Sequence, residues 1–435
     1  MNETVYKERR ERLLELMDEG VAVLSTATMQ TRSNDTEYPF RPNSDFYYLT
    51  GFEEDNSVVV LCKKGAEHRT VLFVQEKVPE MELWTGERLG VDAAKECFSF
   101  DEVYGIKSFE EQIKELLKEQ TLLYFELFDD NRVYTQLKAA ANTMLHTRGV
   151  TRSPRTFSDI TKLTQQMRLI KSHAEIALIK QALSITEQAH HHAMKTCQPG
   201  MPEYKLQAEY EYIFKKEGAY SDAYTTIIAG GNSANTLHYI KNDQPLKEGD
   251  LVLVDAGCEY GYYASDITRS YPVNGKFTPA QKELYNMILD VQLKVIAAIK
   301  PGGSKKELQT FSEKLLAQGM LDFGILEGDI KKLIEEKAHK KYFPHGIGHW
   351  MGLDVHDPCP YSDDNGDELL FEEGMVLTIE PGLYLPHDDE NVPKKYRGIG
   401  IRIEDNILVT KVGCENLSSA IAKTVDEIEE MCKSE

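Results

Sequence analysis

Two aspartates stand in a stretch that is otherwise built like a β-hairpin, and their type and spacing raise the first chemical question. The stretch is VLVDAGCEYGYYASDITRSY, Val252–Tyr271, and Tyr260-Gly261 is the expected two-residue turn. With that turn Asp255 and Asp266 face each other directly, with Cβ atoms roughly 4.5–5.5 Å apart, where like charges destabilise a sheet. The register must therefore slip, or one carboxyl must be protonated, or a cation must lie between the two.

Two more strand-like runs carry one carboxylate each in the second half of the chain. Glu380 ends VLTIE beside the sharp stop Pro381-Gly382, and Glu404 follows Arg402 in IRIED on the same face of the strand. A single carboxylate of this kind is usually an edge or surface residue, and the two aspartates could likewise lie on a solvated hairpin. Four of them in apolar strands favour a shared site.

Histidines gather in FPHGIGHWMGLDVHD, a glycine-rich stretch that holds His345, His349 and His356. Gly346 follows His345, so the His-Glu-x-x-His motif of a zincin helix is excluded. A lone histidine is most often a core or surface residue, whereas three in such a loop favour a site. His238, in NTLHYIKND, is a fourth and weaker candidate.

Four carboxylates with one or more imidazoles form an oxygen-rich donor set. Such a set suits Mn²⁺, Co²⁺, Fe²⁺ or Zn²⁺, and the hardness of its ligands favours manganese. Bridging carboxylates hold two metals roughly 3.5–4 Å apart in hydrolytic two-metal sites. The sequence therefore predicts two divalent ions per subunit. Cys258 has the opposite strand parity from Asp255 and is expected to point away from them.

The elements that must position these residues show a faint internal repeat. CQPGMPEYKLQAEYEYIF at Cys197–Phe214 aligns with IKPGGSKKELQTFSEKLL at Ile299–Leu316, at a constant offset of 102 residues. In each copy one helix ends at Pro-Gly, another begins, and strand-like runs follow. A duplicated unit of this kind predicts one domain with pseudo-twofold symmetry and a site between its halves; a chance alignment is the alternative.

The region before residue 150 alternates β-rich runs with a helical pattern and holds no catalytic cluster, which is typical of a small α/β domain. The basic and polar region Gly149–Ser172 is expected to connect it to the rest. Ser172-x-x-Glu175 is a capping box that opens a helix, and His190–His192 farther along are interpreted as solvated helix surface. The fold class expected is thus α+β, with domains at 1–165 and 172–435.

Composition excludes several classes of protein. The chain has 435 residues and a formal net charge of −21, which argues against nucleic acid or an anionic membrane as partner. Its seven cysteines stand singly, without a Cys-x-x-Cys pair, so a disulfide framework or structural zinc site is not expected and a reducing compartment fits. No apolar run approaches the ~18 residues of a membrane span. A cytoplasmic location is expected.

The motifs as a group resemble the metallopeptidase family that shares the pita-bread fold, which includes methionine aminopeptidase, prolidase and aminopeptidase P. The resemblance is greatest to bacterial-type aminopeptidase P and covers nearly the whole chain. It rests on VDAGCEYGYYASDITRSYPV, HGIGHWMGLDVHD, TIEPGLY and GIRIEDN. It rests also on EYPFRPNSDFYYLTGF (Glu37–Phe52) and LWTGERLG (Leu83–Gly90), which are similar to that group's N-terminal domain.

The resemblance implies a role for each candidate residue. Asp266 and Glu404 would bridge two metals, Asp255 would complete one, and His349 with Glu380 would complete the other. The family's neighbouring and substrate-binding residues are matched by His238, His345, His356 and Arg402.

The resemblance also implies an oligomeric state, and at two places the sequence departs from the family pattern. Trp84 resembles a residue that closes the site of a neighbouring subunit in a tetramer, which implies a homo-oligomer, either dimer or tetramer. The segment Thr156–Met167 and Asp222, which replaces a proline near Tyr224, depart from the family pattern. No substrate role is carried onto them.

The activity implied is metal-dependent hydrolysis of the N-terminal Xaa-Pro bond of a peptide, releasing its first residue. A hydroxide bridging the two metals would attack the carbonyl, and Glu380 would shuttle the proton. His356 or His238 would stabilise the oxyanion, and His345, Arg402 and Trp84 would form the proline pocket.

Three alternatives remain beside this activity. The first is an Xaa-Pro dipeptidase (prolidase), which shares the ligands. The second is a non-catalytic pita-bread module that binds peptides or proteins. A metal-free hydrolase of the creatinase type is disfavoured, because every metal ligand of the family has its counterpart here.

Overall fold

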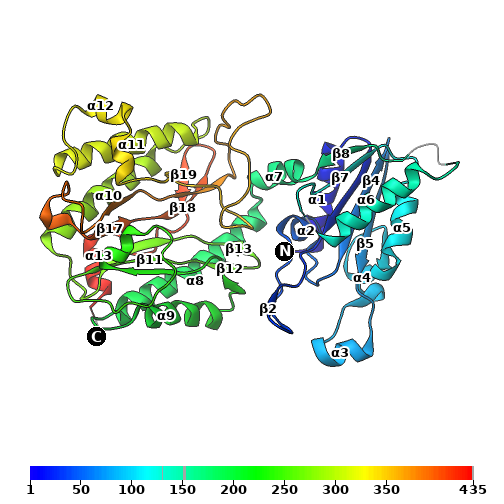
Figure 1. The fold of residues 1–435 in the computed structure, drawn as a ribbon, viewed down its shortest axis with the longest axis horizontal. Coiled ribbons are helices and arrows are strands. Elements are labelled where there is room, and N and C mark those ends of the chain that lie inside the picture. Colours follow the sequence, from blue (N-terminus) through cyan, green and yellow to red (C-terminus); the bar gives the residue numbers. More distant parts are fainter. Residues whose placement is uncertain (130, 150–152, 434–435) are drawn as a thin grey trace. The chain divides into compact units, whose positions relative to one another are not determined.

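The chain forms two compact units, Met1–Met167 and Arg168–Glu435, in a computed structural model that describes residues 1–129, 131–149 and 153–433 (Figure 1). The predicted connecting region, Gly149–Ser172, lies partly outside these residues, at 150–152. In the described part of the chain no helix is both long and apolar enough to cross a membrane.

The N-terminal unit is built on a mixed sheet of six strands in the order β6-β5-β4-β1-β7-β8, with helices α5 and α6 packed on a shared core. The β-rich runs and the helical pattern expected here are confirmed. Its elements are α1 (Glu3–Leu16), β1 (Gly20–Ser25), β2 (Thr31–Ser33), β3 (Thr36–Glu37), α2 (Ser44–Thr50), β4 (Val58–Lys64), β5 (Glu67–Val74), α3 (Pro79–Thr85), α4 (Gly90–Cys97), β6 (Glu102–Gly105), α5 (Phe109–Leu116), β7 (Leu122–Phe125), α6 (Arg132–Leu145), β8 (Thr156–Asp159) and α7 (Thr161–Leu169), which reaches the unit boundary.

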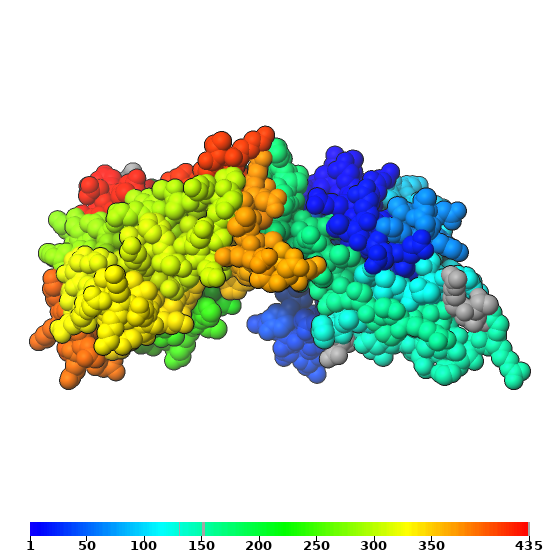
Figure 2. All heavy atoms as spheres, turned by 90° about the horizontal axis from the view of Figure 1, so that it is seen from above, coloured from blue at the N-terminus to red at the C-terminus, as the bar shows by residue number. Residues whose placement is uncertain are grey.

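The second unit holds two helix pairs and short antiparallel sheets, of which β10-β11-β14, β13-β12-β9 and β15-β18-β19 are three-stranded. Helices α10, α11 and α12, yellow-green to yellow in Figure 2, form one outer face of this unit. Its elements are α8 (His173–Thr196), α9 (Glu203–Lys216), β9 (Ser221–Asp222), β10 (Ile227–Gly230), β11 (Leu251–Asp255), β12 (Cys258–Tyr260), β13 (Tyr263–Ala264), β14 (Thr268–Pro272), α10 (Pro279–Ala298), α11 (Lys305–Asp322), α12 (Ile330–Glu335), β15 (Val376–Ile379), β16 (Gly382–Leu385), β17 (Ile399–Arg402), β18 (Asp405–Val409), β19 (Cys414–Asn416) and α13 (Val425–Met431).

The internal repeat corresponds to a repeated structure. Helix α8 ends at Thr196 and α9 begins at Glu203, while α10 ends at Ala298 and α11 begins at Lys305, so the offset of 102 residues holds at both ends. Each pair is followed by a three-stranded antiparallel sheet. In Figure 1 the strands lie between the two helix pairs. The expected α+β fold with two similar halves is confirmed.

The hairpin register differs from the prediction. Tyr260 pairs with Tyr263, so the turn is Gly261-Tyr262, and both of these residues have positive φ, 54° and 66°. Such a turn suits a two-residue hairpin, but positive φ is unusual for tyrosine and has no sequence signal. Asp255 therefore lies opposite Thr268 and not opposite Asp266. The slip of two residues keeps both aspartates on the same face of the hairpin.

Helix α8 confirms one expectation and corrects another. Its capping box between Ser172 and Glu175 is present. His190, expected at the solvated surface, is instead fully buried, with its ring bonded to Ala256 O at 3.2 Å and to the Tyr210 hydroxyl at 3.0 Å. Three consecutive helical residues point in three directions, and one of those directions is the core.

Candidate metal centre and substrate cavity

A cavity of about 280 Å³ in the second unit brings together the predicted site residues except Trp84. It lies where strand ends of both halves meet, and the glycine-rich loop between α12 and β15 forms one wall. Its lining consists of Leu237, His238, Asp255, Asp266, Lys305, His345, Gly346, Gly348, His349, His356, Glu380, Arg402 and Glu404. Residues from four separate sequence motifs thus share one space.

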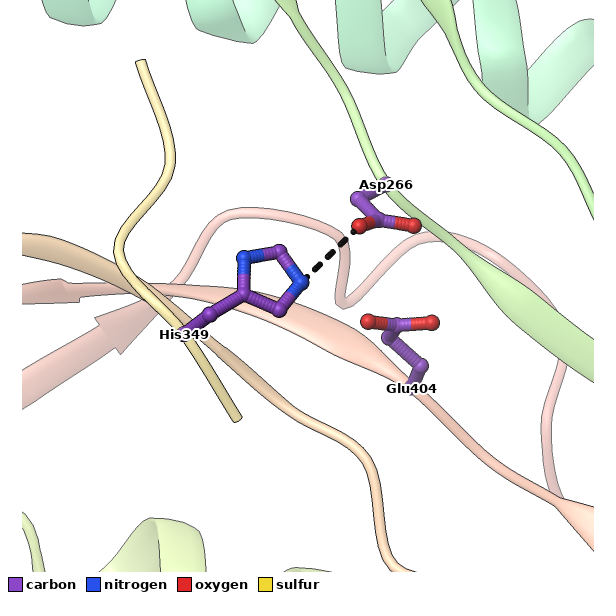
Figure 3. Close-up of side chains that lie close together, drawn as sticks. All are labelled: Asp266, His349 and Glu404. Atoms are coloured by element: carbon purple, nitrogen blue, oxygen red, sulfur yellow. Dashed lines mark ion pairs between the residues drawn. The ribbon is translucent and has the colours of Figure 1, made fainter. Parts of the chain in front are cut away.

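Asp266, His349 and Glu404 form the tightest group of possible metal donors, with one atom of each lying within 4.8 Å of the others. Figure 3 shows the three side chains pointing toward one another, with His349 Nε2 3.2 Å from Asp266 Oδ2. Glu380 also lies near His349, with Oε1 3.8 Å from His349 Nε2. Three of the five predicted ligands therefore lie close enough to share one metal ion, and Glu380 lies beside one of them, His349.

The backbone holds these donors in place through bonds between strand ends. Asn406 accepts from the Asp266 N–H at 3.1 Å and donates to the Asp266 carbonyl at 2.6 Å. The Glu404 N–H donates to Thr268 O at 3.1 Å. Gly348, beside His349, has no room for a side chain, because a Cβ there would lie 1.9 Å from Thr378 O.

Asp255, the fifth predicted ligand, lines the same cavity but is bonded to other side chains. Its Oδ2 accepts from Arg402 Nη2 at 2.6 Å, and its Oδ1 accepts from the Tyr224 hydroxyl at 2.6 Å. Arg402 thus compensates the negative charge of Asp255 directly. Cys258 lies on the other side of the strand as expected, with Sγ 3.4 Å from Ala182 O of α8.

The remaining carboxylates are poorly compensated by protein groups alone. Burial raises the pKa of Glu380 to about 7, and burial together with repulsion from Asp266 raises the pKa of Glu404 well above its usual range. Burial would lower the pKa of His349, but the hydrogen bond and charge of Asp266 outweigh it and raise that pKa to about 9. Buried like charges of this kind call for a cation, and oxygen donors with one imidazole fit a divalent metal ion.

His345 lies in a hydrogen-bonded chain that fixes its tautomer. Its Nδ1 lies 2.7 Å from Gly346 O and so carries the proton, while its Nε2 accepts from the Tyr384 hydroxyl at 2.8 Å. The Tyr384 oxygen in turn accepts from Arg402 Nη1 at 3.0 Å. Burial and the charge of Arg402 lower the pKa of His345 to about 3. The imidazole is therefore neutral and aligned.

His356 and His238 lie on exposed loops at the rim of the cavity. The His356 ring is 4.3 Å from the His349 ring and nearly perpendicular to it. The next residue, Asp357, is buried and bonded to Lys171 Nζ at 2.9 Å and to Arg168, which anchors the loop that carries His356. Trp84 belongs to α3 of the N-terminal unit and is 83% exposed; its role at a neighbouring subunit stays a prediction.

The structure adds residues that the sequence analysis did not select. Tyr384 lies inside the motif TIEPGLY, and Thr268 follows Asp266 by two positions, so the position of each beside a candidate ligand was a signal that could have found it. Thr268 donates to Glu404 Oε2 at 2.7 Å and accepts from Arg402 Nε at 3.0 Å. Tyr224 had been named only as a neighbour of Asp222. Lys305 had no sequence signal beyond its place at the start of a repeated helix.

Replacement of Tyr384 by phenylalanine should lower kcat/KM about tenfold while the fold is retained. The change removes the hydroxyl that joins His345 to Arg402, and a hydrogen bond to a charged group contributes about 1.5–3 kcal/mol. Steady-state kinetics of the metal-loaded variant would test this. Tyr204→Phe, on an exposed part of α9, is the matched control. An unchanged kcat/KM in Tyr384→Phe would show that the hydrogen bonds from Arg402 through Tyr384 do not orient His345.

Comparison with known proteins gives a consistent result across the whole chain. The family model described as metallopeptidase family M24 matches residues 177–411, and the aminopeptidase P N-terminal domain matches residues 6–124. Xaa-Pro aminopeptidase of Escherichia coli K12 is 42% identical over 431 residues, 98% of this chain and 96% of the relative. Human Xaa-Pro aminopeptidase 3 is 37% identical, covering 99% of this chain and 86% of the relative.

Solved structures agree with the sequence relatives. Zinc-substituted E. coli aminopeptidase P in complex with product matches with a TM-score of 0.96 and 40% identity, over 99% of this chain and 98% of that chain. Proline aminopeptidase P II from Yersinia pestis matches with the same TM-score and 42% identity, over 99% of each chain. The resemblance to aminopeptidase P seen in the motifs is confirmed, and the chain belongs to metallopeptidase family M24, with an aminopeptidase P N-terminal domain ahead of its catalytic domain.

Proposed function

We propose that the protein is a metal-dependent Xaa-Pro aminopeptidase, which hydrolyses the first peptide bond of substrates that have proline in second position. The observation that carries this proposal is the cavity in which Asp266, His349 and Glu404 present donor atoms within 4.8 Å of one another, beside Glu380 and Arg402. The full-length relatives named Xaa-Pro aminopeptidase support the substrate class.

We assign the metal ligands to Asp255, Asp266, His349, Glu380 and Glu404. Asp255 would exchange part of its contact with Arg402 and Tyr224 for a metal contact. Divalent ions held there would polarise the scissile carbonyl and lower the pKa of water toward neutrality. The M24 family implies divalent metal ions; two ions per subunit, with Mn²⁺ as the native metal, are part of the proposal.

The chain's own residues supply proton transfer and substrate placement. Glu380 would take a proton from water and pass it to the leaving amine. His345 Nδ1 lies 3.6 Å from Glu380 Oε2, so the neutral imidazole borders the path of that proton. His356 or His238, at the rim, would donate to the developing oxyanion. His345 and Arg402, with Trp84 of a second subunit, would form the proline pocket. Homo-oligomeric assembly and a cytoplasmic location stay predictions.

The substrate class is tested with three peptides and manganese-loaded protein. Ala-Pro-Ala should release its first alanine at least about a hundredfold faster, in kcat/KM, than Ala-Ala-Ala, because the proposed pocket would bind the proline ring. Cleavage of Ala-Pro with no cleavage of Ala-Pro-Ala would reassign the protein to the dipeptidase class. Binding of all three peptides without cleavage would favour the non-catalytic binding module.

A further inference from the structure

Lys305 is a cation in the cavity to which none of the roles above applies. It is the first residue of α11, and its side chain lines the same space as the metal donors. In the described part of the chain no carboxylate lies within ion-pair distance of its ammonium group. Glu380 is the acidic group whose charge acts on it, from farther away.

Aromatic residues fix where this ammonium group lies. Lys305 Nζ lies 4.1 Å from the centre of the Tyr361 ring. Tyr361 stacks on the buried Trp350 with ring centres 5.5 Å apart, and its hydroxyl accepts from the Trp350 N–H at 3.2 Å. Trp350 follows His349 directly. The lysine is therefore held by a wall that is continuous with the metal centre.

Local stability gives no reason for a cation at this position. Lysine at the N-terminus of a helix opposes the helix dipole, which favours acidic residues there. Partial burial also lowers the pKa of Lys305, which shows that its surroundings disfavour the charge. The ring contact with Tyr361 compensates only in part. The position of the Lys305 ammonium group, unfavourable for the free protein, is explained by an anion that the ligand brings.

The charge balance of the metal-loaded cavity also favours an anionic group on the ligand. The four lining carboxylates are Asp255, Asp266, Glu380 and Glu404, whose charge two divalent ions would neutralise. Arg402 donates Nη2 to Asp255 and Nη1 to Tyr384, so its guanidinium is engaged. Lys305 remains as the cation with a free donor, facing the space that a peptide would enter.

We propose that Lys305 binds a carboxylate of the substrate and makes the enzyme selective for peptides that present a carboxylate to it. This inference rests on the proposed function. The carboxylate could be the C-terminus of a short peptide or an acidic side chain, since both present the same two oxygens to an ammonium donor. If the carboxylate is the C-terminus, Lys305 would select peptides by length. If it is a side chain, Lys305 would select them by sequence.

Three matched peptide pairs test the inference and distinguish the two sources. Ala-Pro-Ala is compared with its C-terminal amide, Ala-Pro-Glu amide with Ala-Pro-Gln amide, and Glu-Pro-Ala amide with Gln-Pro-Ala amide. Wild-type protein should prefer the charged member of at least one pair by about tenfold in kcat/KM, mainly through KM. Lys305→Met should lose that preference, so that its kcat/KM for the charged member falls to its kcat/KM for the neutral member. Lys305→Glu should reverse it.

Lys306→Met is the matched control, because Lys306 is the neighbouring lysine, is exposed and does not line the cavity. It should keep the wild-type preference. Calorimetric titration with the products Pro-Ala and Pro-Ala amide repeats the C-terminal comparison without turnover. The inference is overturned if wild-type protein prefers no charged member, or if Lys305→Met slows both members of the preferred pair equally. Cleavage of the neutral peptides by wild-type protein tests the proposed function separately.

Discussion

Replacement of Asp266 or Glu404 by alanine is expected to abolish metal binding and turnover together while the protein stays folded. Each residue is assigned to both metals, so its loss removes a ligand from each ion. We expect kcat/KM to fall by at least about 10³-fold, the scale at which a lost metal centre removes its charge stabilisation. Bound metal is counted by elemental analysis, and the fold is followed by circular dichroism.

The fold should survive because Glu404 is repelled by its neighbours without metal, and because the backbone contacts of Asp266 do not depend on its side chain. Removing Glu404 relieves repulsion from Asp266, Glu380 and Asp255 in the metal-free protein. The paired contacts of Asn406 with the Asp266 backbone do not involve the aspartate side chain. Glu372→Ala, on the exposed surface of the same unit, serves as the control. Wild-type activity in either site variant would rule out the two-metal assignment.

The metal-free protein is expected to lose stability as the pH rises from about 6.5 to 9. The pKa of His349 is raised to about 9 in the folded state, so the stability it contributes is present below about 6.5 and lost as the pH passes 9. The raised pKa values of Glu380, about 7, and Glu404 act in the same direction. The His349 shift alone corresponds to about 3 kcal/mol, or roughly 5–10 °C in Tm.

Other buried histidines do not reverse this trend. Burial lowers the pKa of His190 and His345 to about 3, so they add stability as the pH rises toward 6.5 and nothing further above it. Bound metal keeps His349 neutral and the carboxylates ionised, so the metal-loaded protein should keep its Tm across the same range. Thermal unfolding with and without Mn²⁺ at three pH values measures the difference. Equal slopes in the two states would mean that metal does not bind at these residues.

The repeat and the face on which the aspartates lie could be predicted from the sequence, because both depend on periodicity. Helix starts at Glu203 and Lys305 follow from the Pro-Gly signals. The hairpin register could not be predicted, since a tyrosine with positive φ at 262 has no sequence signal. The face was nevertheless correct, because a slip of two residues leaves every side chain on its original side.

The predicted site residues came from motifs, and the structure adds what motifs do not contain. The bonds of Tyr384 and Thr268 depend on strands that pair across long sequence separations. Lys305 enters the cavity because α11 begins there, at a distance of 44 positions from His349 along the chain. His190 could have been assigned to the core, since it continues the buried stripe of Ile179, Leu183 and Thr186.

The most direct test of the proposed function is a manganese titration of metal-stripped protein with Ala-Pro-Ala as substrate, in which bound metal and released alanine are measured on the same samples. No release is expected without metal, and activity should rise until two ions are bound per chain and then stay constant. Undiminished release by the metal-free protein, or no release at any metal content, would contradict it.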